Sequence, residues 1–411
     1  MRLFLLELKR LLKNRRSIAV VCFMLAFTIF MAWVPTSFIM SHDTAGNPLT
    51  GLDALAYDKN LEQGIAGTVT PEKVQQALIT YQDVFARYNA ETTFDLPDEA
   101  YDEINAVQGL LFDLGDLYPD KNGQTQPWLE IDPDEVTSYY ETMPSARRSH
   151  LAGAIIPPCP AWAITFVDLY AQVDTPFNYV PGADATTLDY LILLSFVLLL
   201  CCALITAPVF SSDYQTGADD IQRCTKNGRA RLGWTRVFAS LLICGVLTSV
   251  CLALYWCISN SLYGWEVTDA SAQMLALFGP LTPLPFDFGG LQILFSVLAL
   301  LTILATVCAV LLLSSRLKNL VAATGCALLL CFLPVLVYMT LPAIVVDWVN
   351  TFLPSTGVAL QACTLYATRY YNILHLGDLI CWTPIATSIA GAVELVLFAA
   401  LAVVSYVRRH A

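Results

Sequence analysis

Six long runs of apolar residues that are almost free of charge divide the chain, and they are the main signal in its hydrophobic pattern. The runs cover residues 17–40, 187–210, 237–259, 291–315, 320–346 and 385–407. Each has about 20 residues or more, the length an α-helix needs to cross a hydrocarbon core of about 30 Å. The pattern therefore predicts an all-α polytopic membrane protein with six transmembrane helices.

One long hydrophilic segment, residues 41–186, separates the first two runs. Its apolar positions recur at helical spacing between residues 71 and 90, where Thr70 is suited to be an N-cap and Pro71 to be the first helical residue. Further helices are expected over 98–117 and 134–154. We interpret the segment as a mainly helical extracytoplasmic domain inserted between the first two spans.

The first 16 residues place leucines on one helical stripe and basic residues on the rest, which is typical of an amphipathic helix in the membrane interface. A plain positively charged flank of the first span is the alternative. The first run also resembles a signal peptide, but it exceeds the usual apolar length, and residues 35–43 contain no convincing cleavage site. We interpret it as an uncleaved membrane anchor.

Lysine and arginine predict the orientation of the spans, because they concentrate in cytoplasmic segments. Of the 22 basic residues, 15 fall before the first run, after the second, between the fourth and fifth, and after the last. Alternating spans bring all four places to one side, so both termini are expected in the cytoplasm. The connections 260–290 and 347–384 then face outward. They are too apolar for solvated loops, so short helices or re-entrant turns packed on the spans are expected.

Composition adds that 56% of the residues are hydrophobic and 14% are charged, as expected for a membrane protein. The net charge of −12 arises mainly in segment 41–186, which holds 23 of the 34 acidic residues. Most of the 13 cysteines lie in the apolar runs, and no C-x-x-C pair occurs. Cys159, Cys363 and Cys381 face outward, where a disulfide or free thiols are equally compatible with the sequence.

Signatures of catalysis are missing from the sequence. It contains no P-loop, no H-E-x-x-H and no G-x-S-x-G motif, and its four histidines are scattered. We therefore expect no enzyme activity, no metal site and no cofactor in this chain. Glu394 stands near the middle of the last run. A carboxyl there is functional, or a neutral, hydrogen-bonded structural acid, or nearer the surface because the span is slightly shifted. Pro208, Pro334 and Pro342 are expected to break or bend their helices.

The loop over 211–236 carries the most informative pattern. Acidic residues come first, a short amphipathic helix follows at about 218–225, and a basic turn leads into the third span. Asp219 suits the N-terminus of that helix, and Arg223 and Lys226 suit its C-terminus. A solvated connector with positive charge is the simpler reading. A short helix that stands off the membrane would also give a soluble partner a rigid element to bind.

This loop resembles the corresponding loop of the permease subunits of ABC-2-type transporters, in the bacterial group with six spans. The pattern of an aromatic residue, an acid, a spaced glycine, a short helix and a basic turn is matched by Phe210, Asp213, Gly217, Ile221, Lys226, Gly228 and Arg229. The other residues of the loop that are expected to couple to the ATPase are Tyr214, Asp219 and Arg223. The usual acid of the family is Glu, whereas this chain has Asp213. The resemblance includes the six-span layout and the basic amphipathic start, but not segment 41–186.

The resemblance implies a permease in a bacterial cell membrane, an exporter rather than an importer, that works as a dimer with a second permease chain, the same or a related one. A separate ABC ATPase subunit would bind ATP and Mg and dock on the loop. Asp213 and Arg229 would make charged contacts with it, and Gly217 would allow the turn. Spans two and five would line the interface between the two permeases. Membrane lipid is the other expected partner, and nucleic acid is not.

The alternative is a polytopic sensor or assembly protein whose outer domain binds a peptide or an envelope ligand.

Overall fold

The computed structural model describes residues 2–43, 46–121, 123–154, 169–225, 228–376 and 379–408. Cys159 and Lys226 lie outside these residues. The chain divides into two compact units. Unit 1 consists of Met1–Ala32, Asp189–Trp256 and Leu294–Ala411, and unit 2 of Trp33–Leu188 and Cys257–Ile293.

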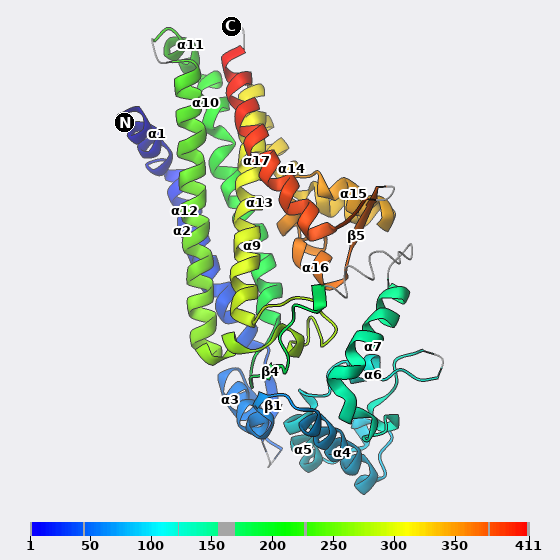
Figure 1. The fold of residues 1–411 in the computed structure, drawn as a ribbon. Coiled ribbons are helices and arrows are strands. Elements are labelled where there is room, and N and C mark those ends of the chain that lie inside the picture. The colour runs from blue at the N-terminus through cyan, green and yellow to red at the C-terminus, as the bar shows by residue number, and fades with distance from the viewer. Residues whose placement is uncertain are drawn as a thin grey trace. The chain divides into compact units, whose positions relative to one another are not determined.

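The described residues contain six helices that are long and apolar enough to cross a membrane, which confirms the predicted all-α polytopic membrane protein (Figure 1). They are α2 (Arg15–Ser37), α9 continued by α10 (Thr186–Thr206 and Pro208–Thr216), α12 (Ala230–Tyr263), α13 (Phe288–Arg316), α14 (Leu320–Thr340) and α17 (Thr383–Arg408). Several are longer than the apolar runs, because polar residues at their ends continue the helix.

The remaining elements of unit 1 are short. They are α1 (Arg2–Leu12), α11 (Ala218–Arg223), α15 (Ala343–Thr351), α16 (Thr364–Arg369), two 3₁₀ turns at Thr356–Val358 and Leu360–Ala362, and the antiparallel hairpin of β5 (Ile373–Leu376) and β6 (Leu379–Trp382). Helix α1 forms where the basic amphipathic helix was predicted. It lies at the same end of the long helices as α11 and the last turn of α17 (Figure 1).

Pro208 separates α9 from α10, as its missing N–H predicts. Ser314 of α13 fills the break. Its hydroxyl donates to the carbonyl of Ala207 (2.6 Å) and accepts from the backbone N–H groups of Phe210 and Ser211 (3.1 Å each). Three backbone groups at this break are thus bound by a neighbouring helix.

Pro334 lies inside α14, which continues through it. Because proline has no N–H, the carbonyl of Leu330 loses its donor four residues later. The hydroxyl of Ser355 replaces that donor at 2.8 Å. Thr306 of α13 donates to the carbonyl of Pro354, also at 2.8 Å. The segment that follows α15 therefore re-enters between α13 and α14, in line with the short helices and re-entrant turns expected after the fifth span.

The fifth long helix ends at Thr340, earlier than the predicted boundary at residue 346. Pro342 is the reason, because its backbone is extended and it stands at the N-cap of α15. Residues 343–346 therefore belong to a separate short helix rather than to the span.

Unit 2 is mainly helical, as predicted. Its helices are α3 (Leu52–Leu61), α4 (Pro71–Tyr88), α5 (Asp98–Gln108), α6 (Leu114–Leu117) and α7 (Tyr139–Ala154). The expected cap of α4 is present, since the Thr70 hydroxyl accepts from the backbone N–H of Lys73 at 3.3 Å. Two small antiparallel pairs were not predicted, namely β1 (Met40–His42) with β2 (Pro48–Thr50) and β3 (Gly67–Thr68) with β4 (Asn178–Tyr179). The described residues of the unit also form six 3₁₀ turns, at Glu62–Ile65, Thr93–Asp95, Trp128–Glu130, Glu135–Ser138, Trp265–Asp269 and Ala272–Met274.

The connection between the third and fourth spans belongs to unit 2, which corrects the expectation that it packs on the spans. Met274 and Leu281 join the core around Leu114 and Phe177. The backbone N–H of Asn178 donates to the Ser271 hydroxyl at 2.9 Å. Segment 41–186 leaves part of its core uncovered, and the apolar connection buries that surface.

Mutation can test whether the Ser355 hydroxyl replaces the N–H that Pro334 lacks as the donor to the Leu330 carbonyl. Ser355→Ala leaves the Leu330 carbonyl buried without a donor, which should cost about 1–3 kcal/mol of stability. Pro334→Ala restores an N–H at the position where helical geometry needs it. The double variant should therefore melt at a higher temperature than Ser355→Ala alone in the same detergent. Equal melting of the two variants would contradict the assignment.

Candidate functional site

The loop between the second and third spans forms two short helices and a tight turn. Gly217 ends α10 and begins α11 with φ +72°, a left-handed backbone that glycine adopts without strain. Gly228 closes the turn on the other side of α11. A side chain there would overlap the carbonyl oxygen of Gln222, so only glycine fits. The two glycines thus delimit a six-residue helix.

A buried arginine lies beneath this helix. Arg236 of α12 is 1% exposed and is the largest of the fully buried side chains. Its guanidinium forms an ion pair with Asp213 of α10 and donates to the side-chain oxygen of Gln222 at 2.7 Å. Since arginine remains protonated in proteins, its burial demands an anionic partner at this point.

Helix α1 supplies the rest of the charge cluster, which we define as Glu7, Arg10, Asp213 and Arg236. Arg10 donates to Asp213 at 2.9 Å and to the backbone carbonyl of Val209 at 3.1 Å. Glu7 lies 3.0 Å from Arg10 and 3.5 Å from Arg236. Two acids and two bases give the cluster no net charge, and together they join α1, α10 and α12.

Aromatic rings complete the surroundings of Arg236. Its guanidinium carbon lies 5.5 Å from the ring centre of Phe210 and 5.8 Å from that of Tyr406, within cation–π range. The two rings are 5.1 Å apart. The Tyr406 hydroxyl donates to the carbonyl of Gly228 at 3.1 Å. The last turns of α17 are therefore tied to the turn that follows α11.

The residues singled out in this loop divide into a buried and an exposed group. Phe210, Asp213, Asp219 and Gly228 are buried, and Tyr214 is half-buried with its hydroxyl donating to the Ser315 carbonyl at 3.2 Å. Gly217, Ile221 and Arg229 are exposed. Arg223 is the last residue of α11. Asp213 thus lies in an internal ion cluster of this chain, whereas the resemblance predicts that it contacts the ATPase subunit.

Two members of the cluster escaped the sequence reasoning. Glu7 is the lone acid among the first 16 residues and stands three positions before Arg10, a spacing at which helical side chains meet. In the sequence analysis, Arg236 is one of the basic residues that predict the orientation of the spans. Its burial could have been predicted from its position, because it is the seventh residue of a helix whose later residues are apolar.

Glu394 lies elsewhere and is not part of the cluster. It is buried on α17, twelve positions before Tyr406, or about 18 Å along the helix. It lines an apolar groove of about 550 Å³ with Val393, Leu397 and Trp348. Within the described parts of the chain, no three potential metal ligands come together.

Comparison with protein-family models, with curated proteins and with solved structures finds no match to this chain. The geometry of the site and the six apolar helices are therefore the observations from which its function is argued.

Breaking the charge cluster at Arg236 should destabilise unit 1 strongly. Arg236→Gln leaves three charges, two of them acidic, so we expect a loss of about 3–5 kcal/mol. Adding Asp213→Asn leaves the neutral pair of Glu7 and Arg10, and the double variant should be more stable than the sum of the single losses predicts. Thermal unfolding in detergent measures both effects.

Arg229→Gln is the matched control, because it removes an exposed arginine from the same loop and should change stability by less than about 0.5 kcal/mol. A loss at Arg236 no larger than the loss at Arg229, or strict additivity of the Asp213 and Arg236 losses, would argue against a coupled cluster.

Proposed function

We propose that the chain is the membrane-spanning permease subunit of an ABC-2-type transporter and is driven by a separate ATPase subunit. The proposal rests on three features taken together. They are six apolar helices, a basic amphipathic helix at the N-terminus and a short displayed helix after the second span. The conclusion that the protein spans a membrane is the part that the six helices support directly.

The observation that carries the proposal is the surface of α11. Ile221 is 75% exposed on this short helix, and Asp220 beside it is also exposed. A single exposed apolar residue is common on protein surfaces. Here, however, it stands on a six-residue helix that the buried cluster and the Tyr406 hydrogen bond hold from beneath. Such a helix offers a partner an apolar anchor on a rigid support.

The same contacts provide a route for mechanical coupling. A partner that binds α11 differently in its ATP-bound and nucleotide-free states would shift the equilibrium of this helix. Through Gly217 the displacement reaches α10, and through Asp213 it reaches Arg236 of α12 and Arg10 of α1. In this proposal the buried cluster transmits the movement, whereas Ile221, Asp220 and Arg229 contact the partner.

In this reading α11 and both termini face the cytoplasm of a bacterial cell, and unit 2 faces outward. Two permease chains would associate, with the helices around Pro208 and Pro334 at their interface. The apolar spans favour export of an amphipathic or lipid-like compound, a peptide or an antimicrobial agent. ATP and Mg would bind to the partner subunit.

The test is purification of the full-length protein from the membranes of its native host. The proposal expects a co-purifying subunit that contains a P-loop and hydrolyses ATP, with activity that depends on the permease. Ile221→Ser should reduce both co-purification and permease-dependent ATPase activity several-fold while the melting temperature stays unchanged. Val407→Ser is the matched control, because it removes another exposed aliphatic side chain, from the last turn of α17, outside the proposed permease interface.

Loss of the ATPase in both variants would point to a general effect of polar substitution. A protein that retains full transport without any P-loop subunit would exclude the ABC-2 proposal.

The second candidate, a polytopic sensor or assembly protein, is favoured by a cleft in unit 2. Its volume is about 600 Å³, and its lining includes Asp43, Asp58, Glu62, Asp98 and Asp102. Burial raises the pKa of Asp58, while the Ser41 hydroxyl opposes that shift. An acidic cleft of this kind suits a cationic ligand. Absence of an ATPase partner would favour this function.

A further inference from the structure

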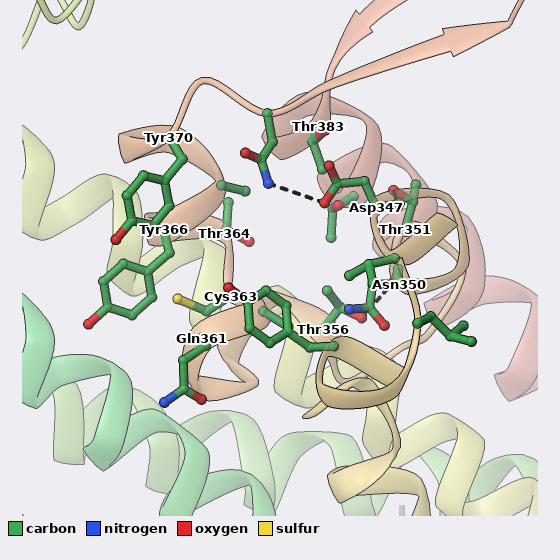
Figure 2. A pocket seen from close by; sticks show the side chains of 17 residues that line it. Asp347, Asn350, Thr351, Thr356, Gln361, Cys363, Thr364, Tyr366, Tyr370 and Thr383 are labelled. Atoms are coloured by element: carbon green, nitrogen blue, oxygen red, sulfur yellow. Dashed lines mark hydrogen bonds between the residues drawn. The ribbon is translucent and has the colours of Figure 1, made fainter. Parts of the chain in front are cut away.

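A cavity of about 450 Å³ lies in unit 1 (Figure 2). It is at the ends of α14 and α17 that are remote from α1 (Figure 1). The chain between those helices encloses it, because the segment re-enters beside Pro334 and then returns through α16 and the β5–β6 hairpin. Its size is within the usual range of small-molecule sites. Nothing in the ABC-2 proposal uses this cavity, so the inference below stands independently of it.

One wall of the cavity is acidic and rich in hydrogen-bond acceptors. Asp347 of α15 is half-buried, and its carboxylate accepts from the Asn372 side chain at 3.1 Å (Figure 2). Burial raises the pKa of Asp347, and the hydrogen bond from Asn372 opposes that shift. None of the lining residues, all of which are described, is a lysine, arginine or histidine. The cavity therefore presents a carboxyl without a basic counterpart.

Two further lining groups are buried without a hydrogen-bond partner in the described part of the chain. They are the side-chain oxygen of Asn350, a residue 4% exposed, and the hydroxyl of Thr383, a residue 5% exposed. The Asn350 amide nitrogen donates to the Pro334 carbonyl at 3.4 Å, which leaves its oxygen for another donor. Buried polar atoms of this kind are uncommon and call for a specific explanation.

Asn372 brings two of these groups together. Its side chain donates to Asp347, and its backbone carbonyl accepts from the N–H of Thr383 at 3.0 Å. Asn350 follows Asp347 by three positions on α15, a spacing that places both side chains on one face of the helix. The acceptors thus form one polar wall instead of being scattered around the cavity.

The other walls are aromatic and aliphatic. Tyr366 and Tyr370 stack with ring centres 6.2 Å apart. The Tyr366 hydroxyl is already engaged with Asp189 at 2.9 Å, so the lining that it offers is its ring. Leu341 and Val346 add aliphatic surface. A ligand that fills this space has a polar end with several donors and a short apolar or aromatic body.

We propose that this cavity binds a primary ammonium compound, whose N–H groups donate to Asp347, the Asn350 side-chain oxygen and the Thr383 hydroxyl. An ammonium matches three acceptors with three donors and neutralises the lone carboxyl. An anion would meet a carboxyl and no base. A bare metal ion would leave most of the volume and the aromatic wall unused. The amine can belong to a free small molecule or to a lipid headgroup, since both present the same group.

The test uses the full-length protein in phosphatidylcholine nanodiscs, because the quaternary ammonium of that lipid has no N–H to donate. Saturable binding of 2-phenylethylamine is followed by ligand-observed NMR, with 2-phenylethanol as the neutral analogue. The wild-type protein should bind the amine and discriminate against the alcohol. Asp347→Asn should weaken binding of the amine by at least about tenfold, as expected for a lost charged hydrogen bond.

Two further variants make the test specific. Thr383→Val keeps the side-chain shape and should weaken amine binding about three- to tenfold, whereas a merely structural threonine would leave it unchanged. Glu394→Gln removes a buried carboxyl that lines a different groove and should bind the amine as the wild type does. Thr383→Val also keeps the proposal testable if Asp347→Asn fails to fold.

Nanodiscs that contain phosphatidylethanolamine distinguish the two sources of the amine. Amine binding that this lipid displaces assigns the cavity to a headgroup, and binding that it leaves unchanged assigns it to a free compound. The proposal is overturned if the wild type shows no saturable amine binding and no effect of the lipid. It is also overturned if Asp347→Asn and Thr383→Val bind the amine as tightly as the wild type does, which would indicate a cavity that holds water only.

Discussion

The ion pair between Asp213 and Arg236 is the constraint on which one end of unit 1 depends. A guanidinium that is 1% exposed cannot lose its proton, so a carboxylate must stay beside it wherever α12 places it. That requirement sets the position of α10. Glu7 and Arg10 extend the same requirement to α1, and the Tyr406 hydrogen bond brings in the end of α17. Such burial adds little net stability, but it leaves few alternative arrangements of the four helices.

The spans, the amphipathic start and the capped helix at Pro71 could be predicted from the sequence, because each depends on residues close together in the chain. The direction in which Asp213 faces could not. Its partners are 23 and 203 positions away, and the local pattern of acid, glycine and short helix is the same whether the acid faces a partner or the interior. For the same reason Glu7 went unnoticed, since only the folded chain brings it to Arg236. The exposed position of Ile221 likewise depends on which neighbours cover α11.

Pro208 and Pro334 were expected to break or bend their helices, and their surroundings show why this expectation is incomplete. In a bilayer a freed carbonyl or N–H has no water to bind, so a break must be satisfied by other parts of the protein. Ser314 does this beside Pro208, and Ser355 does it beside Pro334. At each of these prolines, a distant segment thus supplies the missing hydrogen bonds and is held in place by them. The second of these contacts holds the chain beside α14 directly before Thr356, which lines the cavity of about 450 Å³.

Unit 2 is assembled from two stretches of chain that a ribosome delivers at different times. Residues 33–188 emerge first, and the connection with Met274 and Leu281 follows only after two more apolar helices have been made. Domains that are synthesised early usually fold as soon as they emerge. Here the core cannot be complete before Met274 and Leu281 have been made, so unit 2 cannot finish folding before the second and third long helices have been synthesised.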